Sequence, residues 1–362
     1  MHHLKYWIGF NRVAGIGPVR LQQLLAHFEG DLDRAWRASA SELAEAGLDR
    51  RSLANLQSQR VKLDLERELS LLEQHGVTAI TWNDERYPRL LREIPAAPPV
   101  IYLRGQQQPQ DDWAVAIVGT RKVSAYGRRA TEHLASALAE AGLTIVSGLA
   151  LGVDRIAHEA ALNAGGRTIA VLANGVERPY PMRNRKLGEH IVSSGRGLLL
   201  SDYPIGTPPE AANFPPRNRI ISGLSLATVI VEAGERSGAL ITAGNALDQG
   251  RDVFAVPGSI FSPGSQGTNR LIQEGAMPVL KAQDVLDALD LHLAEPRQAV
   301  RELVDATPTE EQVLGVLGAE PRHIDDVGRD CGLQPATLSS TLALLELKGM
   351  VARIGSMNYI RL

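Results

Sequence analysis

The chain has 362 residues, a formal net charge of −3 at pH 7 and an aromatic content of only 4%. This length accommodates two or three domains, and the charge excludes a positive potential over the whole protein, so any nucleic-acid site must be a local basic patch. The single cysteine, Cys331, excludes a disulfide framework and a thiolate zinc cluster, and it suits a reducing compartment.

Residues 1–75 are predicted to form a small helical domain, because leucines recur there at three- to four-residue spacing. Within it, Val13–Arg20 holds a Gly-x-Gly turn that resembles a helix-hairpin-helix, whose N–H groups can hold a DNA phosphate. We favour the simpler alternative, a tight helix connection made with glycines. The N-terminus lacks the apolar core of a signal peptide, and no apolar run is long enough to cross a membrane. We therefore expect a cytoplasmic protein without membrane association.

Residues 76–112 are predicted to be an extended linker region that packs on the core, and residues 113–290 to be a Rossmann-like domain. In the second region, short apolar runs alternate with helical patterns, which predicts an α/β fold with a doubly wound, mostly parallel sheet. The strands are expected at Ala114–Val118, Thr144–Ser147, Thr168–Ala173, Gly197–Ser201, Ala227–Val231, Asp252–Val256 and Pro278–Leu280. Ligands of such sheets bind beyond the carboxyl ends of the strands.

Residues 291–304 are predicted to be a charged linker, and residues 305–362 a winged helix of three helices and a β-hairpin. This last domain carries five basic side chains against eight acidic ones. Because duplex binding depends on neutralising phosphates, the acidic balance argues against a strong duplex site. A protein-interaction role for this domain is at least as well supported.

The stretch Phe214–Ser225 is the most informative part of the chain. Arg217 and Arg219 lie where a helix is expected to begin, just before the apolar run Ala227–Val231. A helix start offers unpaired backbone N–H groups, and two added arginines would make it an anion site suited to phosphate. The alternative is that one arginine caps a strand end or pairs with an acidic side chain.

Two further basic segments follow expected strands. Gly119–Lys122 combines a glycine that allows close backbone approach, a threonine hydroxyl and the forked charge of Arg121. Its alternative is an ordinary strand-to-helix turn. Arg183, Arg185 and Lys186 form the other cluster, a pattern that on its own is typical of a solvated helix face.

A glycine-containing loop beginning at Gly148 follows the second strand of the domain. Asp154 is expected to cap the helix that starts there. His158 comes one turn later and could serve as an acid–base group. No carboxylate and nucleophile are grouped with it, so packing or hydrogen bonding is the favoured role.

Several strand-end loops place an aromatic residue beside a proline. Tyr180, Tyr203 and Phe214 all have this arrangement. An aromatic ring held near arginines can stack an unpaired nucleic-acid base. The competing interpretation is that these rings close the edge of the sheet.

Several motifs occur in a fixed order along the chain: Gly119-Thr-Arg121, Ser147-Gly-Leu-Ala150 with Asp154 and His158, Tyr180-Pro181, Phe214-Pro215 with Arg217-Asn-Arg219, Ser237-Gly238 and Val256-Pro-Gly258. Upstream, Tyr87-Pro-x-x-Leu and Pro99-x-x-Tyr-Leu-x-Gly105 belong to the same pattern. This set resembles the DNA-processing protein family called DprA or Smf, and the resemblance covers nearly the whole chain.

The resemblance implies a non-enzymatic protein that binds single-stranded DNA, dimerises through its Rossmann-like domain and loads the RecA recombinase during natural transformation. It implies no catalytic residue, no metal and no cofactor. It assigns the principal DNA contacts to Arg121 and the Arg217–Arg219 cluster. The full set of expected DNA-binding residues is Gly119, Thr120, Arg121, Lys122, Gly148, Tyr180, Arg183, Arg185, Lys186, Phe214, Arg217, Asn218, Arg219, Ser237 and Gly238.

Two other functions compete with this interpretation. The first is an enzyme that cleaves a base from its ribose phosphate on a similar Rossmann variant. Such enzymes carry a Pro-Gly-Gly-x-Gly-Thr loop near a glutamate; here Glu232 is present, but the loop Ala233–Gly238 lacks the double glycine and the threonine. The second is a duplex-binding regulator built on the winged helix, against which the acidic balance of that domain counts.

Overall fold

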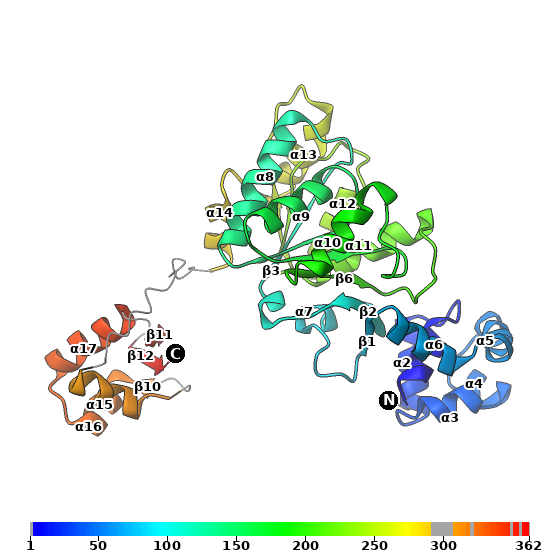
Figure 1. Ribbon diagram of the computed structural model, residues 1–362, viewed down its shortest axis with the longest axis horizontal. Helices are drawn as coiled ribbons and strands as arrows, with labels where there is room; N and C mark the ends of the chain where they lie inside the picture. The colour runs from blue at the N-terminus through cyan, green and yellow to red at the C-terminus, as the bar shows by residue number, and fades with distance from the viewer. Residues whose placement is uncertain (1–2, 291–306, 319–321, 348–349, 355–356, 362) are drawn as a thin grey trace. The chain divides into compact units, whose positions relative to one another are not determined.

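The computed structural model describes residues 3–290, 307–318, 322–347, 350–354 and 357–361, and the chain divides into two compact units between Pro296 and Arg297 (Figure 1). Each unit is described by itself. No helix within these described ranges is long and apolar enough to cross a membrane.

The first unit begins with six helices: α1 (Leu4–Asn11), α2 (Pro18–His27), α3 (Leu32–Arg37), α4 (Ala40–Glu45), α5 (Arg50–Lys62) and α6 (Leu65–Gln74). Their core includes Phe10 and Trp36, whose rings meet edge to face with centroids 5.1 Å apart. In the turn between α1 and α2, the Ala14 carbonyl accepts a 2.7 Å hydrogen bond from Asn55 of α5. This turn therefore packs on a neighbouring helix of the same domain.

The centre of this unit is a nine-stranded sheet in the order β1-β2-β6-β5-β4-β3-β7-β8-β9. The strands are β1 (Val77–Thr81), β2 (Val100–Gly105), β3 (Ala114–Val118), β4 (Thr144–Ser147), β5 (Thr168–Val171), β6 (Gly197–Ser201), β7 (Ala227–Ile230), β8 (Asp252–Ala255) and β9 (Met277–Pro278). β3 to β9 run parallel, which confirms the predicted α/β fold. β1 and β2 add to the edge antiparallel, so the region of residues 76–112 extends the sheet itself.

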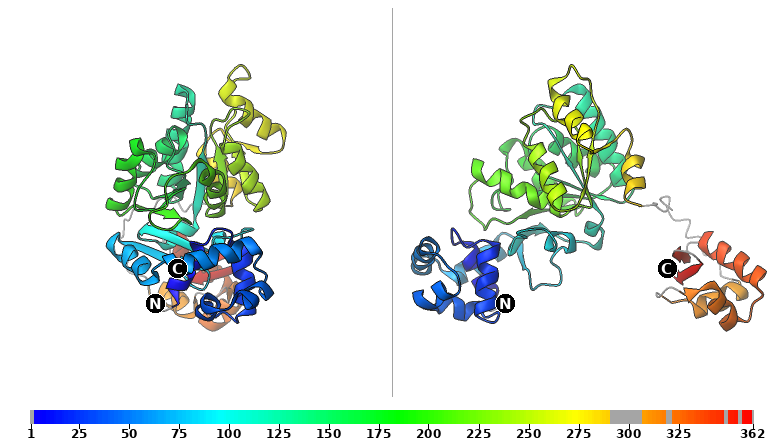
Figure 2. Two further views of the ribbon diagram at one scale, coloured as in Figure 1. Left: turned by 90° about the vertical axis from the view of Figure 1, so that its right-hand side faces the viewer. Right: turned by 180° about the vertical axis from the view of Figure 1, so that it is seen from behind.

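Helices cover both faces of this sheet (Figure 2). They are α7 (Arg89–Arg92), α8 (Ala125–Glu140), α9 (Val153–Asn163), α10 (Arg185–Ser193), α11 (Phe214–Gly223), α12 (Ala239–Asp248), α13 (Gln266–Gln273) and α14 (Ala282–Ala288), with short 3-10 turns η1 (Pro109–Asp112), η2 (Met182–Asn184), η3 (Ala211–Asn213) and η4 (Pro263–Ser265). Side chains alternate between the faces along each strand. Val115 and Ile117 pack with α8 and α9, whereas Ala116 and Val118 pack with α11 and α12.

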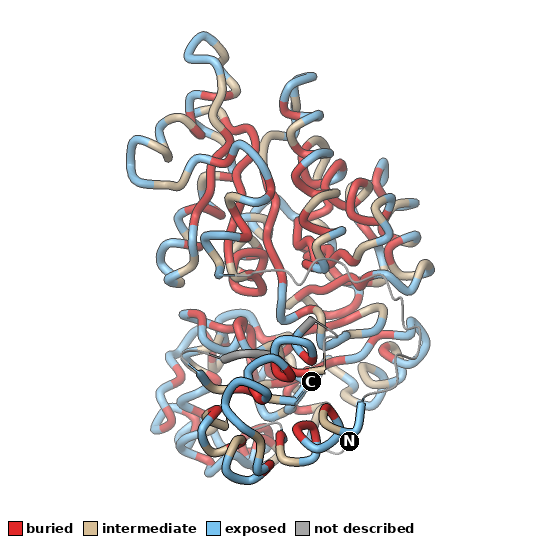
Figure 3. The backbone as a smooth tube through the Cα atoms, turned by 90° about the vertical axis from the view of Figure 1, so that its left-hand side faces the viewer, coloured by how far each residue is buried: buried red, intermediate tan, exposed pale blue. Residues whose placement is uncertain are grey.

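Because both faces are covered, the central strands are apolar throughout. Every residue of Ala114–Val118 is buried, and the strands form the buried layer of this unit (Figure 3). The N-terminal helices cover the far end of the sheet, where Tyr102 of β2 is fully buried in one core with Phe10.

The second unit has the winged-helix arrangement that the sequence predicts. It contains α15 (Pro308–Val316), β10 (Arg322–His323), α16 (Ile324–Cys331), α17 (Pro335–Leu347), β11 (Val351–Ile354) and β12 (Asn358–Arg361), with strand order β10-β12-β11. Thr307 caps α15 by accepting from the Glu310 N–H. Along α17, the helix in the recognition position, residues 335–346 include no lysine or arginine.

Candidate functional site

A cavity of about 1030 Å³ lies at the carboxyl edge of the parallel strands. It is bounded by the loops that follow β3, β4 and β7, by the segment at Tyr180, and by the start of α11. This is the position at which doubly wound sheets place their ligands.

An aromatic and cationic cluster forms one wall of the cavity. The Arg121 guanidinium lies 5.6 Å from the centre of the Phe214 ring, and the Arg217 guanidinium lies 5.8 Å from it. The Tyr180 ring is tilted by 53° to that of Phe214, with centroids 6.1 Å apart. Arg121 and Tyr180 are exposed and Phe214 is half-buried, so flat apolar surface and positive charge are both accessible here.

Arg217 lines the cavity but is only 4% exposed. Its Nη1 donates a 2.9 Å hydrogen bond to the Gly148 carbonyl and a second bond to the Val171 carbonyl. Burial lowers the pKa of Arg217 to about 10, so the side chain stays charged at neutral pH. Much of its hydrogen-bonding capacity is used within the protein, where it ties the loop after β4 to the end of β5.

Arg219 does not line the cavity, although the sequence groups it with Arg217. Its Nη2 donates to the Asp202 carboxylate at 2.9 Å, and its Nη1 donates to the Ala96 carbonyl at 2.7 Å. Residues two apart on a helix point roughly 200° apart around its axis. The two arginines therefore serve different sides of α11.

The loop after β4 is held by side chains rather than left free for an anion. The sequence predicts that Asp154 caps α9, but this prediction is wrong. Gly152, with φ of +82°, occupies the N-cap position instead. The Asp154 carboxylate instead accepts from the backbone N–H groups of Gly148 and Ala150, at 3.1 and 3.3 Å. Asn184 donates to the Leu149 and Ala150 carbonyls from the other side.

His158 is fully buried and has the hydrogen-bonding role that the sequence favours. Its Nδ1 lies 2.6 Å from the Thr168 hydroxyl, which donates its only proton to the Ile145 carbonyl. Nδ1 must then carry the imidazole hydrogen, and Nε2 has no hydrogen-bond partner among the residues that the structure describes. Burial lowers the pKa of His158 to about 3, so the ring is neutral and does not act as an acid–base group near pH 7.

Glu232 does not reach the cavity either. It is 4% exposed, and its carboxylate accepts a 2.9 Å hydrogen bond from the Ser124 N–H. Its backbone carbonyl accepts from the Thr120 N–H at 2.7 Å, which fixes the Gly119–Lys122 loop against the end of β7. The glutamate thus positions loops instead of facing a ligand.

The remaining expected residues divide into two groups. Gly119, Thr120, Gly148, Asn218, Ser237 and Gly238 line the cavity together with Arg121, Tyr180, Phe214 and Arg217. Lys122, Arg183, Arg185, Lys186 and Tyr203 do not line it; the four basic side chains are exposed, and Tyr203 is half-buried.

One functional candidate in the cavity, Arg236, was not predicted from the sequence. This side chain is exposed and lines the cavity from the loop between β7 and α12. The sequence did contain a signal for it, because Arg236 is a basic residue in the glycine-containing loop Glu232–Gly238 at the end of a strand. With Arg121 it makes two exposed arginines at the cavity. Within the described residues, no group of three or more histidine, cysteine, aspartate or glutamate side chains could hold a metal.

An α/β sheet with a cationic, aromatic cavity at its carboxyl edge, together with a winged helix, defines a class of DNA-handling proteins. The family model described as DNA recombination-mediator protein A matches residues 78–290, and the DprA winged helix domain matches residues 294–355. The chain belongs to the DNA recombination-mediator protein A family.

Relatives and solved structures agree with this assignment. The chain is 36% identical to protein Smf of Synechocystis sp., over 98% of each of the two chains. It is 35% identical to protein Smf of Escherichia coli, over 95% of each chain. A solved structure of DNA processing protein A from Streptococcus pneumoniae superposes with a TM-score of 0.69 at 37% identity, over 78% of this chain and 97% of that one. The Helicobacter pylori protein, whose structure is described by its single-stranded DNA binding mode, gives 0.53 at 32% identity, over 59% and 95%.

Proposed function

We propose that this protein binds single-stranded DNA in the cavity at the carboxyl edge of its sheet. The observation that carries the proposal is the cluster of Arg121, Phe214 and Tyr180: the two rings lie 6.1 Å apart, and the Arg121 guanidinium lies 5.6 Å from the centre of the Phe214 ring. An unpaired base can stack on such a ring while its phosphate meets an arginine. The printed description of the Helicobacter pylori relative supports the same choice of ligand.

The charge distribution supports single strands over duplex. Arg121 and Arg236 supply exposed charge at the cavity itself. The helix α17, which would enter a major groove, carries no basic residue over 335–346. A paired base cannot leave its stack to reach Phe214 without losing its pairing energy.

Family membership supports a more specific proposal. We infer that the protein is non-enzymatic, acts in the cytoplasm as a homodimer through its Rossmann-like domain, and loads the RecA recombinase on incoming DNA during natural transformation. For self-association, the half-buried Leu271 and Ile272 beside Gly275 offer small and aliphatic surface.

The competing glycosidase function has a weaker basis. A catalytic carboxylate must lie within hydrogen-bond reach of its substrate, but the Glu232 carboxylate is buried against the Ser124 N–H outside the cavity. An assay for ribose 5-phosphate released from nucleoside monophosphates tests this directly. We expect none; product formation that Glu232→Gln abolishes would favour the enzyme.

The experiment that tests the site compares Arg121→Ala and Phe214→Ala with Arg178→Ala, an exposed arginine outside the cavity. Binding of a fluorescent oligothymidylate is measured by anisotropy over a range of salt concentrations. Each lost phosphate contact should reduce the slope of log affinity against log salt by about 0.7. Arg121→Ala should show this change, and Phe214→Ala should weaken binding with the slope intact. Unchanged binding by both variants would place the DNA elsewhere.

A further inference from the structure

The loop between β8 and α13 carries two large apolar side chains on the surface of the protein. Phe261 is 89% exposed, the highest fraction of any large apolar side chain among the described residues, and its neighbour Ile260 is 77% exposed. Neither side chain lines the cavity at the carboxyl edge of the sheet. The DNA site described above therefore makes no use of this loop.

Hydrogen bonds fix the shape of the loop. The Ser262 N–H donates to the Ser259 carbonyl at 3.0 Å, and the Phe261 N–H donates to the Ser259 hydroxyl oxygen at 3.3 Å. At the base of the loop, the Asn269 side chain bonds both the N–H and the carbonyl of Gly258, at 3.1 and 3.0 Å. The turn thus holds the Phe261 ring outward in advance, which lowers the entropy cost of binding a partner there.

The loop lies directly beside the DNA cavity. Gly234 lines the cavity, and a Cβ added to it would lie 3.2 Å from the Pro263 carbonyl oxygen. The Gly267 N–H also donates to the Ala233 carbonyl at 2.8 Å. Phe261 is two residues from Pro263, so their Cα atoms are at most about 7.6 Å apart. Even at the stacked spacing of about 3.4 Å per nucleotide, a few nucleotides cover this distance.

The order of the strands makes this loop the next one along the edge. β3 pairs with β7 and β7 with β8, at about 4.8 Å per strand, so the loops after these strands lie in a row. Tyr126, which is 46% exposed, donates from its hydroxyl to the Pro257 carbonyl at 2.7 Å and joins the loop after β3 to the loop after β8. Lys122 and Arg236 are exposed in the same row, and neither has an ion pair among the described residues. Phosphates that follow the row toward β8 therefore meet positive charge.

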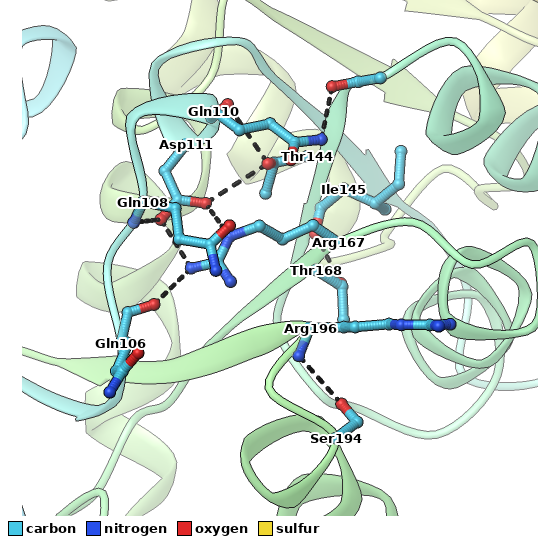
Figure 4. Close-up of polar contacts among 11 residues, drawn as sticks. Gln106, Gln108, Gln110, Asp111, Thr144, Ile145, Arg167, Thr168, Ser194 and Arg196 are labelled. Atoms are coloured by element: carbon cyan, nitrogen blue, oxygen red, sulfur yellow. Dashed lines mark hydrogen bonds and ion pairs between the residues drawn. The ribbon is translucent and has the colours of Figure 1, made fainter. Parts of the chain in front are cut away.

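The amino edge of the sheet differs in its charge. The Arg167 guanidinium there donates to both oxygens of Asp111, at 2.6 and 2.8 Å, so this pair contributes no net charge (Figure 4). Arg196, directly before β6, is exposed at that edge. Because it lies far along the strands from the cavity, Arg196 provides a control for the DNA path.

The size of the apolar surface favours a nucleic-acid base over a protein. A stable protein interface buries about 800 Å² on each partner. An aromatic side chain supplies only about 150–250 Å², and serines adjoin Ile260 and Phe261 on both sides. One ring is sufficient for one base, since stacking needs only a flat apolar face.

We propose that Phe261 is a second stacking point for single-stranded DNA, on which a base rests after the strand has left the cavity toward β8. This inference rests on the proposed DNA-binding function and extends it beyond the cavity. Ile260 has no flat face, so it does not share the role. The ring matters only for strands long enough to pass the rim of the cavity.

The test titrates the full-length protein with fluorescent oligothymidylates of three and of twenty nucleotides, followed by anisotropy. Phe261→Ala removes the side chain, and Phe261→Leu keeps apolar bulk without the ring. Ile260→Ala is the matched control on the same loop, and Arg196→Ala is the control at the amino edge. Phe214→Ala reports on the cavity itself. Circular dichroism checks folding, and light scattering checks the molecular mass.

We expect Phe261→Ala and Phe261→Leu to bind the longer probe roughly tenfold more weakly, which corresponds to about 1.4 kcal/mol and is within the range for one stacked base. Their affinity for the three-nucleotide probe should equal that of the wild type. The slope of log affinity against log salt should also be unchanged, because no charge is removed. Ile260→Ala and Arg196→Ala should match the wild type with both probes, whereas Phe214→Ala should weaken both.

Wild-type binding of the longer probe by Phe261→Ala or by Phe261→Leu would overturn the proposal. An equal loss with the three-nucleotide probe would also overturn it, because the ring would then act within the cavity. A lower molecular mass for both Phe261→Ala and Ile260→Ala would assign the loop to a contact between copies of the chain instead. Unchanged binding by Phe214→Ala would refute the cavity as the DNA site, so failure of that proposal is distinguishable from failure of this one.

Discussion

At the scale of single residues, two arginines close together in the sequence have different roles, because their side chains leave the helix in different directions. Arg217 and Arg219 form one basic cluster in the sequence, but the turn of α11 sends one beneath the cavity and the other to Asp202. Sequence alone could not separate them, because the phase of a helix is known only once its start and its packed face are known. By contrast, Arg121 lies on a strand-end loop, where the position in the chain was sufficient to place it in the cavity.

The burial of Arg217 changes what its removal does. The sequence places Arg217 among the principal DNA contacts, and Arg217→Ala removes it. In the structure the change leaves the Gly148 and Val171 carbonyls without their donor beside the buried Asp154. We predict a loss of about 1–3 kcal/mol in the free energy of unfolding, measured by urea denaturation. Arg121→Ala, on an exposed loop, should retain wild-type stability; equal stability of both variants would contradict the role given to Arg217.

His158 predicts a defined pH dependence of stability. Its pKa is about 3 in the folded protein and 6.5 as a free side chain, so the unfolded state binds the proton first as the pH falls. The folded state therefore loses stability below pH 6.5. At pH 5 the loss from this one group amounts to about 2 kcal/mol.

The measurement compares urea denaturation of wild type and His158→Asn at pH 7 and pH 5. The asparagine amide can replace the Nδ1–H donor to Thr168 but does not titrate. Between pH 7 and pH 5 the wild type should lose about 2 kcal/mol more of its free energy of unfolding than the variant. A similar loss in both proteins would show that His158 is not the titrating group.

At the scale of elements, the strands were predictable because both faces of the sheet are covered. Ala114–Val118 and Gly197–Ser201 are uniformly apolar or small and uniformly buried. The loop after β4 was less predictable, because its conformation depends on partners distant in sequence, such as Asn184. The prediction that Asp154 caps α9 was wrong for the same reason, since an aspartate near the start of a helix is most simply interpreted as a cap.

Gly152 is the point at which two loops of the site touch. A Cβ added there would lie 2.2 Å from the Thr120 carbonyl oxygen, and its φ of +82° already disfavours other residues. Gly142 has a φ of +88° but open space around its Cβ position, so Gly142→Ala is a matched control for backbone strain alone. Gly142→Ala should lower the free energy of unfolding by about 1–2 kcal/mol.

We predict that Gly152→Ala loses clearly more stability than Gly142→Ala, together with its affinity for single-stranded DNA, because the Gly119–Lys122 loop must move. Thermal unfolding and anisotropy titrations measure the two effects. If both variants behave alike, the contact between these loops is not needed for the site.

At the scale of the whole molecule, the doubly wound, mostly parallel sheet and the winged helix followed from the order of apolar runs, and the family followed from the order of motifs. The joining of β1 and β2 to the sheet did not, because antiparallel edge strands and extended linkers have the same local pattern. Charge was informative at this scale as well. The acidic winged helix and the cationic cavity belong to separate compact units.

This division predicts that a chain ending at residue 296 retains its DNA binding. The winged helix offers eight acidic side chains against five basic ones over residues 305–362, so its removal costs little electrostatic attraction. The truncated protein should bind oligothymidylate with nearly full-length affinity and remain dimeric by light scattering. Loss of DNA binding in a folded truncated protein would assign the DNA to the winged helix.

The central claim is that unpaired bases enter the cavity and stack on its aromatic wall. The most direct measurement compares the affinities of the full-length protein for a single strand and for the duplex of the same sequence, in one buffer at one salt concentration. We predict that the single strand binds at least about tenfold more tightly, since each stacked base contributes about 1–3 kcal/mol. Equal affinity for both forms, or a preference for the duplex, would contradict the account.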